Sequence, residues 1–389
     1  MENKEINNII VVWGKNQDIC ALILYNGWFD IDIYFRDACK IGHLDFVKWL
    51  IDKFPNIDIH KPFCGACCNG QLEVAKWLYK VKPDISAMCE YSFRYVCQNG
   101  QLEVAKWLLD VKPDIDISAN NEKAFYLVCF YGHLEVAKWL FEVKPDINIS
   151  VNNESIFFTA CENGYLELAK WLLAVKPDIN ISVYNEYAFR HACENGYLEV
   201  VKWLLDVKPD IDISANDDYA FNEACTHGYL EIVKLLVEKK PDMDTSKLSG
   251  FYRACSNGHL EVVKWLFGIK PDMDISAYNE FAFRRACHHH NIDVAEWLLK
   301  IKPNINISAK NEAAFRGACI NGHLEVAKWL LEIKPDINIS AENDTAFLFT
   351  CDLGNLEVAK WLQSLNPNKY QVNIKNNCIV SHDILNINL

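Results

Sequence analysis

Three short runs of the sequence carry residue types that can bind a metal ion. Residues 64–68 (CGACC) hold two thiols at C-x-x-C spacing, residues 288–290 (HHH) offer three imidazoles, and residues 210–214 (DIDIS) alternate side-chain oxygens as the start of a calcium loop does. Thiolates and imidazoles are zinc ligands, and carboxylates bind calcium. Whether any run is a site depends on the elements that carry it.

Each run lacks the spacing that its metal requires. The C-x-x-C has no second cysteine pair nearby in the sequence. Adjacent side chains on a helix point about 100° apart, and His290 stands where other units have a turn glycine. The aspartate run has Phe221 instead of a bidentate Glu at loop position twelve. We therefore interpret these runs as core packing with a surface thiol, a degenerate turn, and a short extended finger between helix pairs. With no Gly-rich phosphate loop, H-E-x-x-H or G-x-S-x-G, we expect no enzyme, no cofactor and no metal.

The elements that carry these runs belong to an internal repeat. In eleven copies a Cys follows a Phe by four residues and precedes a Trp, or the substitute Leu235, by ten. The Trp residues are at 49, 77, 107, 139, 171, 203, 265, 297, 329 and 361, and most neighbours are 32 apart. Some units are shorter, with 28 or 30 residues. One phase kept over eleven copies indicates a repeat architecture.

Residues 177–209 show the parts of one unit. Phe189, Ala192 and Cys193 share one face of a short helix, which Gly196 ends because glycine adopts the left-handed conformation without penalty. The next residues, LEVVKWLLDV, place apolar side chains at helical spacing, and Pro209 stops that helix. The segment DINIS alternates with period two, and Asn185 follows in a turn. The unit is predicted to be helix, turn, helix and short extended finger.

Neither helix would be stable alone in water, and stacked units can cover each other's apolar faces. We therefore predict an all-α solenoid, with the repeat array over 32–366. Residues 1–31 and 367–389 leave the pattern and are predicted to be N-terminal and C-terminal capping segments. Within them, ICALILYNGW is interpreted as an irregular helix pair and YQVNIKNNCIVSHDIL as a truncated finger and helix.

The segment AFRHACENGYLEVVKWLLDVKPDIN resembles the ankyrin repeat, whose pattern is Thr-Pro-Leu-His-x-Ala-Ala-x-x-Gly-His, an apolar helix and Gly-Ala-Asp. The combination of NGHLEVAKWL with KPDINIS is similar to the ankyrin repeats of giant amoeba viruses such as mimivirus. The Thr-Pro-Leu-His tetrad is largely lost, and Asn185 and its equivalents replace a finger glycine. The resemblance covers roughly residues 33–366. It implies an ankyrin-type solenoid of about eleven repeats that binds proteins through a concave surface of first helices and finger tips.

Residues at the variable positions of that surface are the candidate partner contacts. Tyr126, Phe130 and Tyr131, with Phe158 of the next unit, are predicted to form an aromatic cluster, because aromatic side chains are frequent interface hot spots. The alternative is that Tyr126 or Phe158 packs between helices. A charged counterpart to this cluster would come from Arg190, Arg284, Arg285 and Arg316. The full candidate set is Tyr126, Phe130, Tyr131, Phe158, Glu162, Tyr184, Arg190, Glu194, His227, Arg284, His288, His289 and Arg316. The Trp row could stack ligands, but its helical spacing beside Leu favours a structural ladder.

Composition limits the partners that we expect. The 389 residues carry a net charge of -13 with Lys spread among Asp and Glu, so we predict no basic patch and no nucleic acid. The first residues do not resemble a secretory signal, and no stretch approaches the roughly 20 apolar residues of a membrane span. Eleven of sixteen Cys occupy one repeat position, which favours core packing in a reducing compartment.

Together these observations predict a non-catalytic protein-interaction scaffold. We expect it to be viral and intracellular, in host cytoplasm, with protein partners and no membrane or small-molecule substrate. A structural or virion-associated packing protein is the alternative, because the units are nearly identical.

Overall fold

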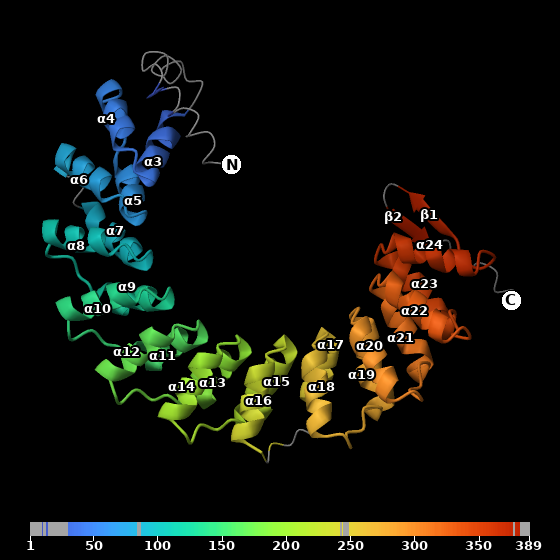
Figure 1. The fold of residues 1–389 in the computed structure, drawn as a ribbon. Coiled ribbons are helices and arrows are strands. Elements are labelled where there is room, and N and C mark those ends of the chain that lie inside the picture. The colour runs from blue at the N-terminus through green and yellow to red at the C-terminus, as the bar shows by residue number, and fades with distance from the viewer. Residues whose placement is uncertain are drawn as a thin grey trace. The chain divides into compact units, whose positions relative to one another are not determined.

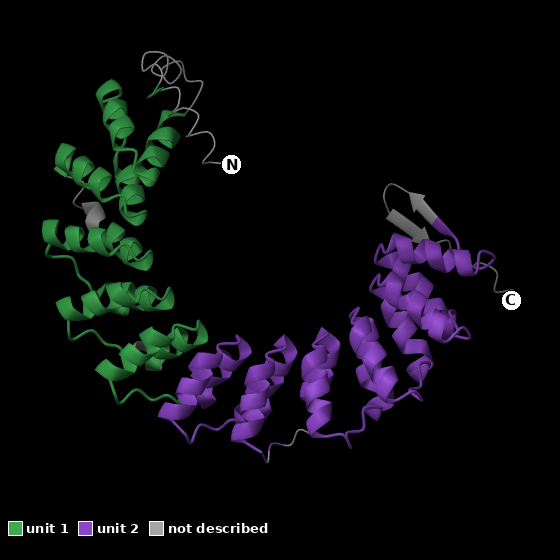
Figure 2. Cartoon of the chain, in the orientation of Figure 1, with its two compact units in different colours: residues 1–183 green, residues 184–389 purple. Residues whose placement is uncertain are grey.

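The structure is a computed structural model that describes residues 10, 13, 14, 30–83, 87–241, 243, 249–375 and 378–381. Side chains are described for all of these except 87–90, 151–153 and 373–381. The chain divides into two compact units, residues 1–183 and residues 184–389 (Figure 2). Each unit is described by itself below.

The described part of residues 1–183 contains five helix pairs that follow one another along the chain (Figure 1). In each pair, the first helix packs against the second, and first helices of neighbouring pairs also pack together. The helices are α3 Ile31–Ile41, α4 Leu44–Lys53, α5 His60–Cys68, α6 Leu72–Val81, α7 Ala87–Gln98, α8 Leu102–Val111, α9 Ala119–Phe130, α10 Leu134–Val143, α11 Val151–Glu162 and α12 Leu166–Val175.

Residues 184–389 continue the same plan and end in an antiparallel strand pair, which contacts α23 and α24. The boundary between the units falls one residue inside α13. The elements are α13 Val183–Glu194, α14 Leu198–Val207, α15 Ala215–His227, α16 Leu230–Lys239, α17 Ser249–Asn257, α18 Leu260–Ile269, α19 Ala277–His288, α20 Ile292–Ile301, α21 Ala309–Ile320, α22 Leu324–Ile333, α23 Ala341–Asp352, α24 Leu356–Leu365, β1 Val372–Lys375 and β2 Cys378–Ser381. The predicted all-α repeat solenoid is confirmed.

The second helix of each unit is amphipathic, as its spacing predicts. In α14, Val200, Val201 and Leu204 are buried, while on the outer face Lys202 Nζ donates to Glu199 Oε1 at 2.7 Å. The backbone leaves helical geometry at Lys208, the residue before proline. No helix in the described part of the chain is both long and apolar enough to cross a bilayer.

The turn between the two helices uses a left-handed residue. Gly196 has φ +82°, and the N–H of Tyr197 reaches back to the carbonyl of Ala192 at 2.9 Å. His290 takes this place in its own unit with φ +66°. The interpretation of the histidine run as a degenerate turn is therefore confirmed.

In the finger between repeat units, buried and exposed side chains alternate, and the backbone forms turns instead of an extended segment. Ile179 and Ile181 are buried, and Asn180 Oδ1 accepts a hydrogen bond from the N–H of Ser182 at 3.1 Å. Asp212 accepts from the N–H of Ser214 in the same way at 3.0 Å. The run resembling a calcium loop is thus a finger, as interpreted.

A turn of left-handed helix follows the long fingers before α9, α13, α15, α19, α21 and α23. Tyr184, Asn185 and Glu186 have φ of 50°, 55° and 60°, whereas the sequence suggested tolerance at the asparagine alone. The shorter finger before α5 has no left-handed residue among residues 55–62. The fingers before α7 and α17 lie largely outside the described residues.

Aromatic rings join successive units. The repeat Phe of one unit contacts the Trp of the next, with ring centroids 6.4 Å apart for Phe125 and Trp171 and 6.2 Å apart for Phe283 and Trp329. The Phe rings are completely buried. The interpretation of the Trp row as a structural ladder is confirmed.

The repeat cysteines are core residues. Burial raises the pKa of their thiols well above the usual range, as for Cys193, and the thirteen cysteines that the structure describes are free thiols. In the CGACC run Cys67 is buried, while Cys64 Sγ accepts from Ser92 Oγ at 3.1 Å. Burial also raises the pKa of Cys64, which disfavours the thiolate that redox chemistry or zinc would need.

The last helix pair is covered by residues just after it. Tyr370 is fully buried, stacks on Phe347 at 4.3 Å and donates to Asp344 Oδ1 at 2.6 Å. It gives Phe347 an aromatic neighbour, as the Trp of the next unit does for Phe315. The expected finger and helix in this segment are two strands instead, and residues 382–389 lie outside the described part. We propose that residues 367–389 act as the predicted cap through this contact.

At the other end, most of residues 1–31 lies outside the described part of the chain, including ICALILYNGW. Trp13 contacts His43 and Phe46, with centroid distances of 5.4 and 5.5 Å.

Alanine at Gly354 should test the left-handed turn without a steric clash. Gly354 has φ +76°, and an added Cβ would meet nothing within 4 Å. We expect Gly354→Ala to lower the free energy of unfolding by about 1 kcal/mol. Gly268→Ala, also in open space but inside α18, should leave stability unchanged or raise it by up to about 1 kcal/mol. Urea unfolding followed by circular dichroism measures both, and equal midpoint shifts would contradict this account.

The buried Asp344 carboxylate should make stability depend on acid pH. Burial acts to raise its pKa, but hydrogen bonds from Lys369, Tyr370 and Ser340 outweigh it, so the pKa of Asp344 is lowered in the folded chain. A lowered folded pKa contributes stability above the unfolded value of about 4, and that contribution is lost as pH falls through the folded value.

Asp344→Asn should therefore cost about 1 kcal/mol at neutral pH, since the partly exposed Lys369 is screened by water. The difference from the unaltered chain should shrink as the pH falls below about 4. Asp352→Asn, an exposed position on the same helix, is the control. Urea unfolding across this pH range measures the effect, and a pH-independent loss in Asp344→Asn would argue against the carboxylate.

Candidate functional site

The candidate contacts lie on the first helices of their units or on the adjoining turns. In residues 1–183 they are on α9 and α11, and in residues 184–389 on α13, α15, α19 and α21. Because first helices of neighbouring units pack side by side, as in α7 with α9 and α19 with α21, their outward side chains line one continuous face within each compact unit.

Three of the predicted aromatic residues meet on α9 and its C-terminal turn. The ring of Phe130 lies 6.1 Å from Tyr126 and 5.0 Å from Tyr131, edge-on to the second. Phe130 is 38% exposed and Tyr131 44% exposed. Lys123 Nζ lies 4.8 Å from the centre of the Tyr126 ring. The cluster forms because residues four apart share a helix face.

The predicted neighbours on α11 are half-buried. Phe158 follows the buried Phe157, and Glu162 ends the helix. The contribution of Phe158 to the aromatic cluster stays a prediction.

Two exposed tyrosines on α7 were missed in the sequence. Tyr91 and Tyr95 are 50% and 38% exposed, and their rings lie 4.7 Å apart. Their four-residue spacing beside the repeat Phe was the available signal. Since α7 packs against α9, we group Tyr91, Tyr95, Tyr126, Phe130 and Tyr131 as the aromatic surface.

The predicted arginines donate hydrogen bonds to backbone carbonyls of the finger turns. Arg284 Nε donates to the carbonyl of Asn279 at 2.7 Å, and its Nη2 donates to that of Tyr278 at 3.1 Å. Arg190 and Arg316 bind their own turns in the same geometry. Arg190 is only 6% exposed, which leaves it little surface to offer a partner, whereas Tyr184 at its finger is 57% exposed.

A carboxylate that recurs after the long fingers, buried in every copy except the half-buried Asp218, is a structural feature that sequence reasoning missed. Glu280 Oε1 accepts the N–H of Asn306 at 3.2 Å, and Glu312 Oε1 accepts that of Asn338 at 3.4 Å. Each bond spans 26 residues and ties one finger to the next. The signal was an acidic residue recurring at one unit position: Glu122, Glu154, Glu186, Asp218, Glu280, Glu312 and Asp344.

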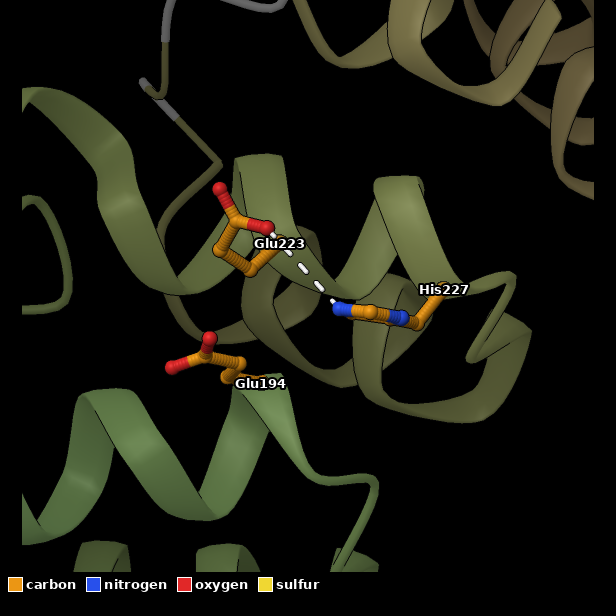
Figure 3. Close-up of side chains that lie close together, drawn as sticks. All are labelled: Glu194, Glu223 and His227. Atoms are coloured by element: carbon orange, nitrogen blue, oxygen red, sulfur yellow. Dashed lines mark ion pairs between the residues drawn. The ribbon is translucent and has the colours of Figure 1, made fainter. Parts of the chain in front are cut away.

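Two of the predicted contacts belong to a polar cluster of α13 and α15 (Figure 3). Glu194, Glu223 and His227 place one ligand atom each within 4.8 Å of one another. Two carboxylates and an imidazole are a donor set that zinc accepts. Tyr219 Oη donates to Glu194 at 2.8 Å, however, and Arg253 Nη1 donates to Glu223 at 2.9 Å. Protein donors already engage both carboxylates, so we interpret the cluster as a polar network between helices.

The histidines on α19 stand beside an arginine. Burial lowers the pKa of His288 and His289, and the charge of Arg285 lowers both further. Their rings contact each other at 4.7 Å. At neutral pH they therefore contribute little positive charge to this face.

Three arginines of α17 and α19 lie near one another, although the absence of a basic patch stays a prediction. Arg284 and Arg285 lie 5.6 and 6.0 Å from the centre of the Phe281 ring, and Arg253 of α17 lines the same pocket as Arg285. These arginines come from neighbouring first helices and are about one repeat apart in the sequence. Only the packing of α17 against α19 brings them together.

Comparisons with known proteins place this geometry in a family. A family model described as ankyrin repeats (3 copies) matches residues 93–185, 157–247, 189–279, 221–311 and 283–376. Among solved structures, the human ASB11 ankyrin repeat domain is similar over 58% of this chain and 96% of its own, with 18% identity and a TM-score of 0.41. No curated protein matched the chain at a significant level. Ankyrin repeats generally act as protein-interaction scaffolds and are typically not enzymes. Because the matched segments together span residues 93–376 without a gap, the chain belongs to the ankyrin repeat family.

Proposed function

We propose that this chain is a non-catalytic scaffold that binds a protein partner through its first helices and finger tips. The observation that carries the proposal is the aromatic surface, defined above by its five residues on α7 and α9. Four of its side chains are exposed: Tyr91 is 50% exposed, Tyr131 is 44% exposed, and Tyr95 and Phe130 are each 38% exposed. Large aromatic rings held in water release free energy when a partner covers them.

Tyrosine suits recognition for a further reason. It loses little conformational entropy on binding and offers both an apolar ring and a hydroxyl. Tyr91 already contacts Tyr95, and Phe130 already contacts Tyr131. These rings therefore lose even less conformational entropy when a partner binds. The basic Lys123 beside Tyr126 adds a cation at the edge of the surface.

The framework beneath this surface is constant while the surface itself varies between units. The two residues after the repeat Cys are Phe130 and Tyr131 in one unit and Glu162 and Asn163 in the next. A binding site of this kind is built from several units, each supplying its own side chains. The resemblance to ankyrin proteins implies that the first helices and finger tips form a concave face. We propose that the partner binds on this face.

We further propose that the chain is a viral protein acting in the host cytoplasm. Support comes from the similarity of its NGHLEVAKWL and KPDINIS motifs to the repeats of giant amoeba viruses. Fractionation of infected amoebae with an antibody against the chain tests the location. Recovery only from purified particles would instead favour the alternative, a virion-associated packing protein.

Replacing Tyr126, Phe130 and Tyr131 together by alanine should weaken partner binding by about 30-fold or more, since hot-spot aromatics each contribute on the order of 2 kcal/mol. Partners would be recovered by affinity capture, identified by mass spectrometry and titrated against both forms.

Val81→Ala with Val143→Ala is the matched control. It trims exposed apolar side chains of the second helices and should leave affinity unchanged. Circular dichroism must show that both variants keep their helices. Equal affinity of the triple variant and the unaltered chain would remove the aromatic surface from the proposal.

A further inference from the structure

A pocket of about 380 Å³ lies among the first helices α15, α17 and α19. It is separate from the aromatic surface, which belongs to residues 1–183. Its lining includes the guanidiniums of two arginines, an aromatic ring and several hydroxyls. The residues used below are Thr226, Tyr252, Arg253, Ser256, Phe281 and Arg285.

The two arginines of the pocket differ in how their charge is matched. Arg253 Nη1 lies 2.9 Å from Glu223 Oε1, a salt bridge, and donates to Thr226 Oγ1 at 3.2 Å. Among the described residues, Arg285 forms one hydrogen bond, from Nε to Ser256 Oγ at 3.3 Å, and no ion pair. Its two Nη groups are therefore available as the parallel donors that a carboxylate accepts.

A second observation points to a missing polar partner. Tyr252 is 9% exposed, and its hydroxyl is buried without a hydrogen-bond partner among the described residues. Buried hydroxyls are nearly always paired in native proteins. Burial raises the pKa of Tyr252, so the hydroxyl stays protonated and can donate. The Tyr252 ring contacts Phe281 at 5.0 Å, and both residues line the pocket.

The charge of the pocket selects the kind of anion. Glu223 neutralises Arg253, and Arg284 is occupied by its own finger carbonyls next to the buried Glu280. The nearby histidines are mainly neutral at pH 7, because burial and the neighbouring positive charges lower their pKa values. One positive charge, that of Arg285, is left without a counterion. It matches a carboxylate of charge -1, whereas a phosphorylated side chain brings about -1.5 to -2 and would leave excess negative charge beside Glu223.

We propose that this pocket binds the side-chain carboxylate of an aspartate or glutamate in an acidic segment of a partner protein, with Arg285 as the paired donor. The inference deepens the proposed scaffold function and rests on it. The whole chain carries a net charge of -13, so an acidic segment finds attraction only where positive charge is concentrated. Because Arg253 is paired with Glu223, it cannot replace Arg285 as the donor to the carboxylate.

The test uses fluorescein-labelled peptides of Gly and Ser around a central Glu-Glu-Glu, titrated by fluorescence anisotropy into the full chain at low salt. The Glu peptide should bind, and the matched Gln peptide should not. Arg285→Gln should weaken the Glu peptide by about tenfold or more, as loss of a bidentate charged pair does. Arg36→Gln, which removes the same charge from the first helix α3, should change affinity by less than about twofold.

The proposal is overturned if the Glu peptide fails to bind at millimolar concentration, if the Gln peptide binds equally well, or if Arg285→Gln has no effect. A phosphoserine peptide or single-stranded oligonucleotide that binds more tightly, with the same dependence on Arg285, would also overturn the carboxylate assignment. The variant with alanine at Tyr126, Phe130 and Tyr131 should keep its affinity for the Glu peptide. If the chain still captures a partner protein but does not bind the Glu peptide, this inference is wrong and the proposed scaffold function is unaffected.

Discussion

Neighbouring repeat units bury each other's apolar side chains, and the short helices are stable because of this burial. Each unit has a second helix of ten residues and a first helix of similar length, and such helices are marginal alone in water. The repeat Phe, with no exposed surface, contacts the Trp of the following unit, as Phe125 does Trp171. Removing a unit would expose its neighbour's Phe. At the last repeat Tyr370 stacks on Phe347 instead, so an aromatic ring covers the repeat Phe there as well.

The fingers satisfy a second constraint, because left-handed backbone costs about 1–2 kcal/mol for each residue that is not glycine. Three such residues occur in succession in most long fingers. Arg284 holds two carbonyls of its turn, and Glu280 accepts an N–H of the following finger. These bonds offset the cost by pairing backbone groups that the tight turn removes from water. Charged side chains that look available for chemistry in the sequence are therefore part of the framework.

Once the framework is constant, the exposed face of the first helices is free to vary. In residues 1–183 it carries tyrosines and a phenylalanine, and in residues 184–389 it carries arginines and hydroxyls around a pocket. These surfaces differ in chemistry although the helices beneath them are nearly the same. An aromatic surface favours apolar anchors of a partner, and an arginine without a counterion favours a carboxylate.

The sequence by itself determined the period, the helix pairs, the turn glycines, the buried Phe and Cys, and the contact of Tyr126, Phe130 and Tyr131. All of these depend on spacings within one helix or turn, where about four residues complete a turn of helix and a glycine or proline ends it. Tertiary structure decided the pairing of Glu312 with Asn338, the burial of Arg190, the strands after α24 and the meeting of Arg253 with Arg285. Most of these contacts join residues about one repeat apart. Their geometry follows from how helices stack and fingers turn, which local spacing does not encode.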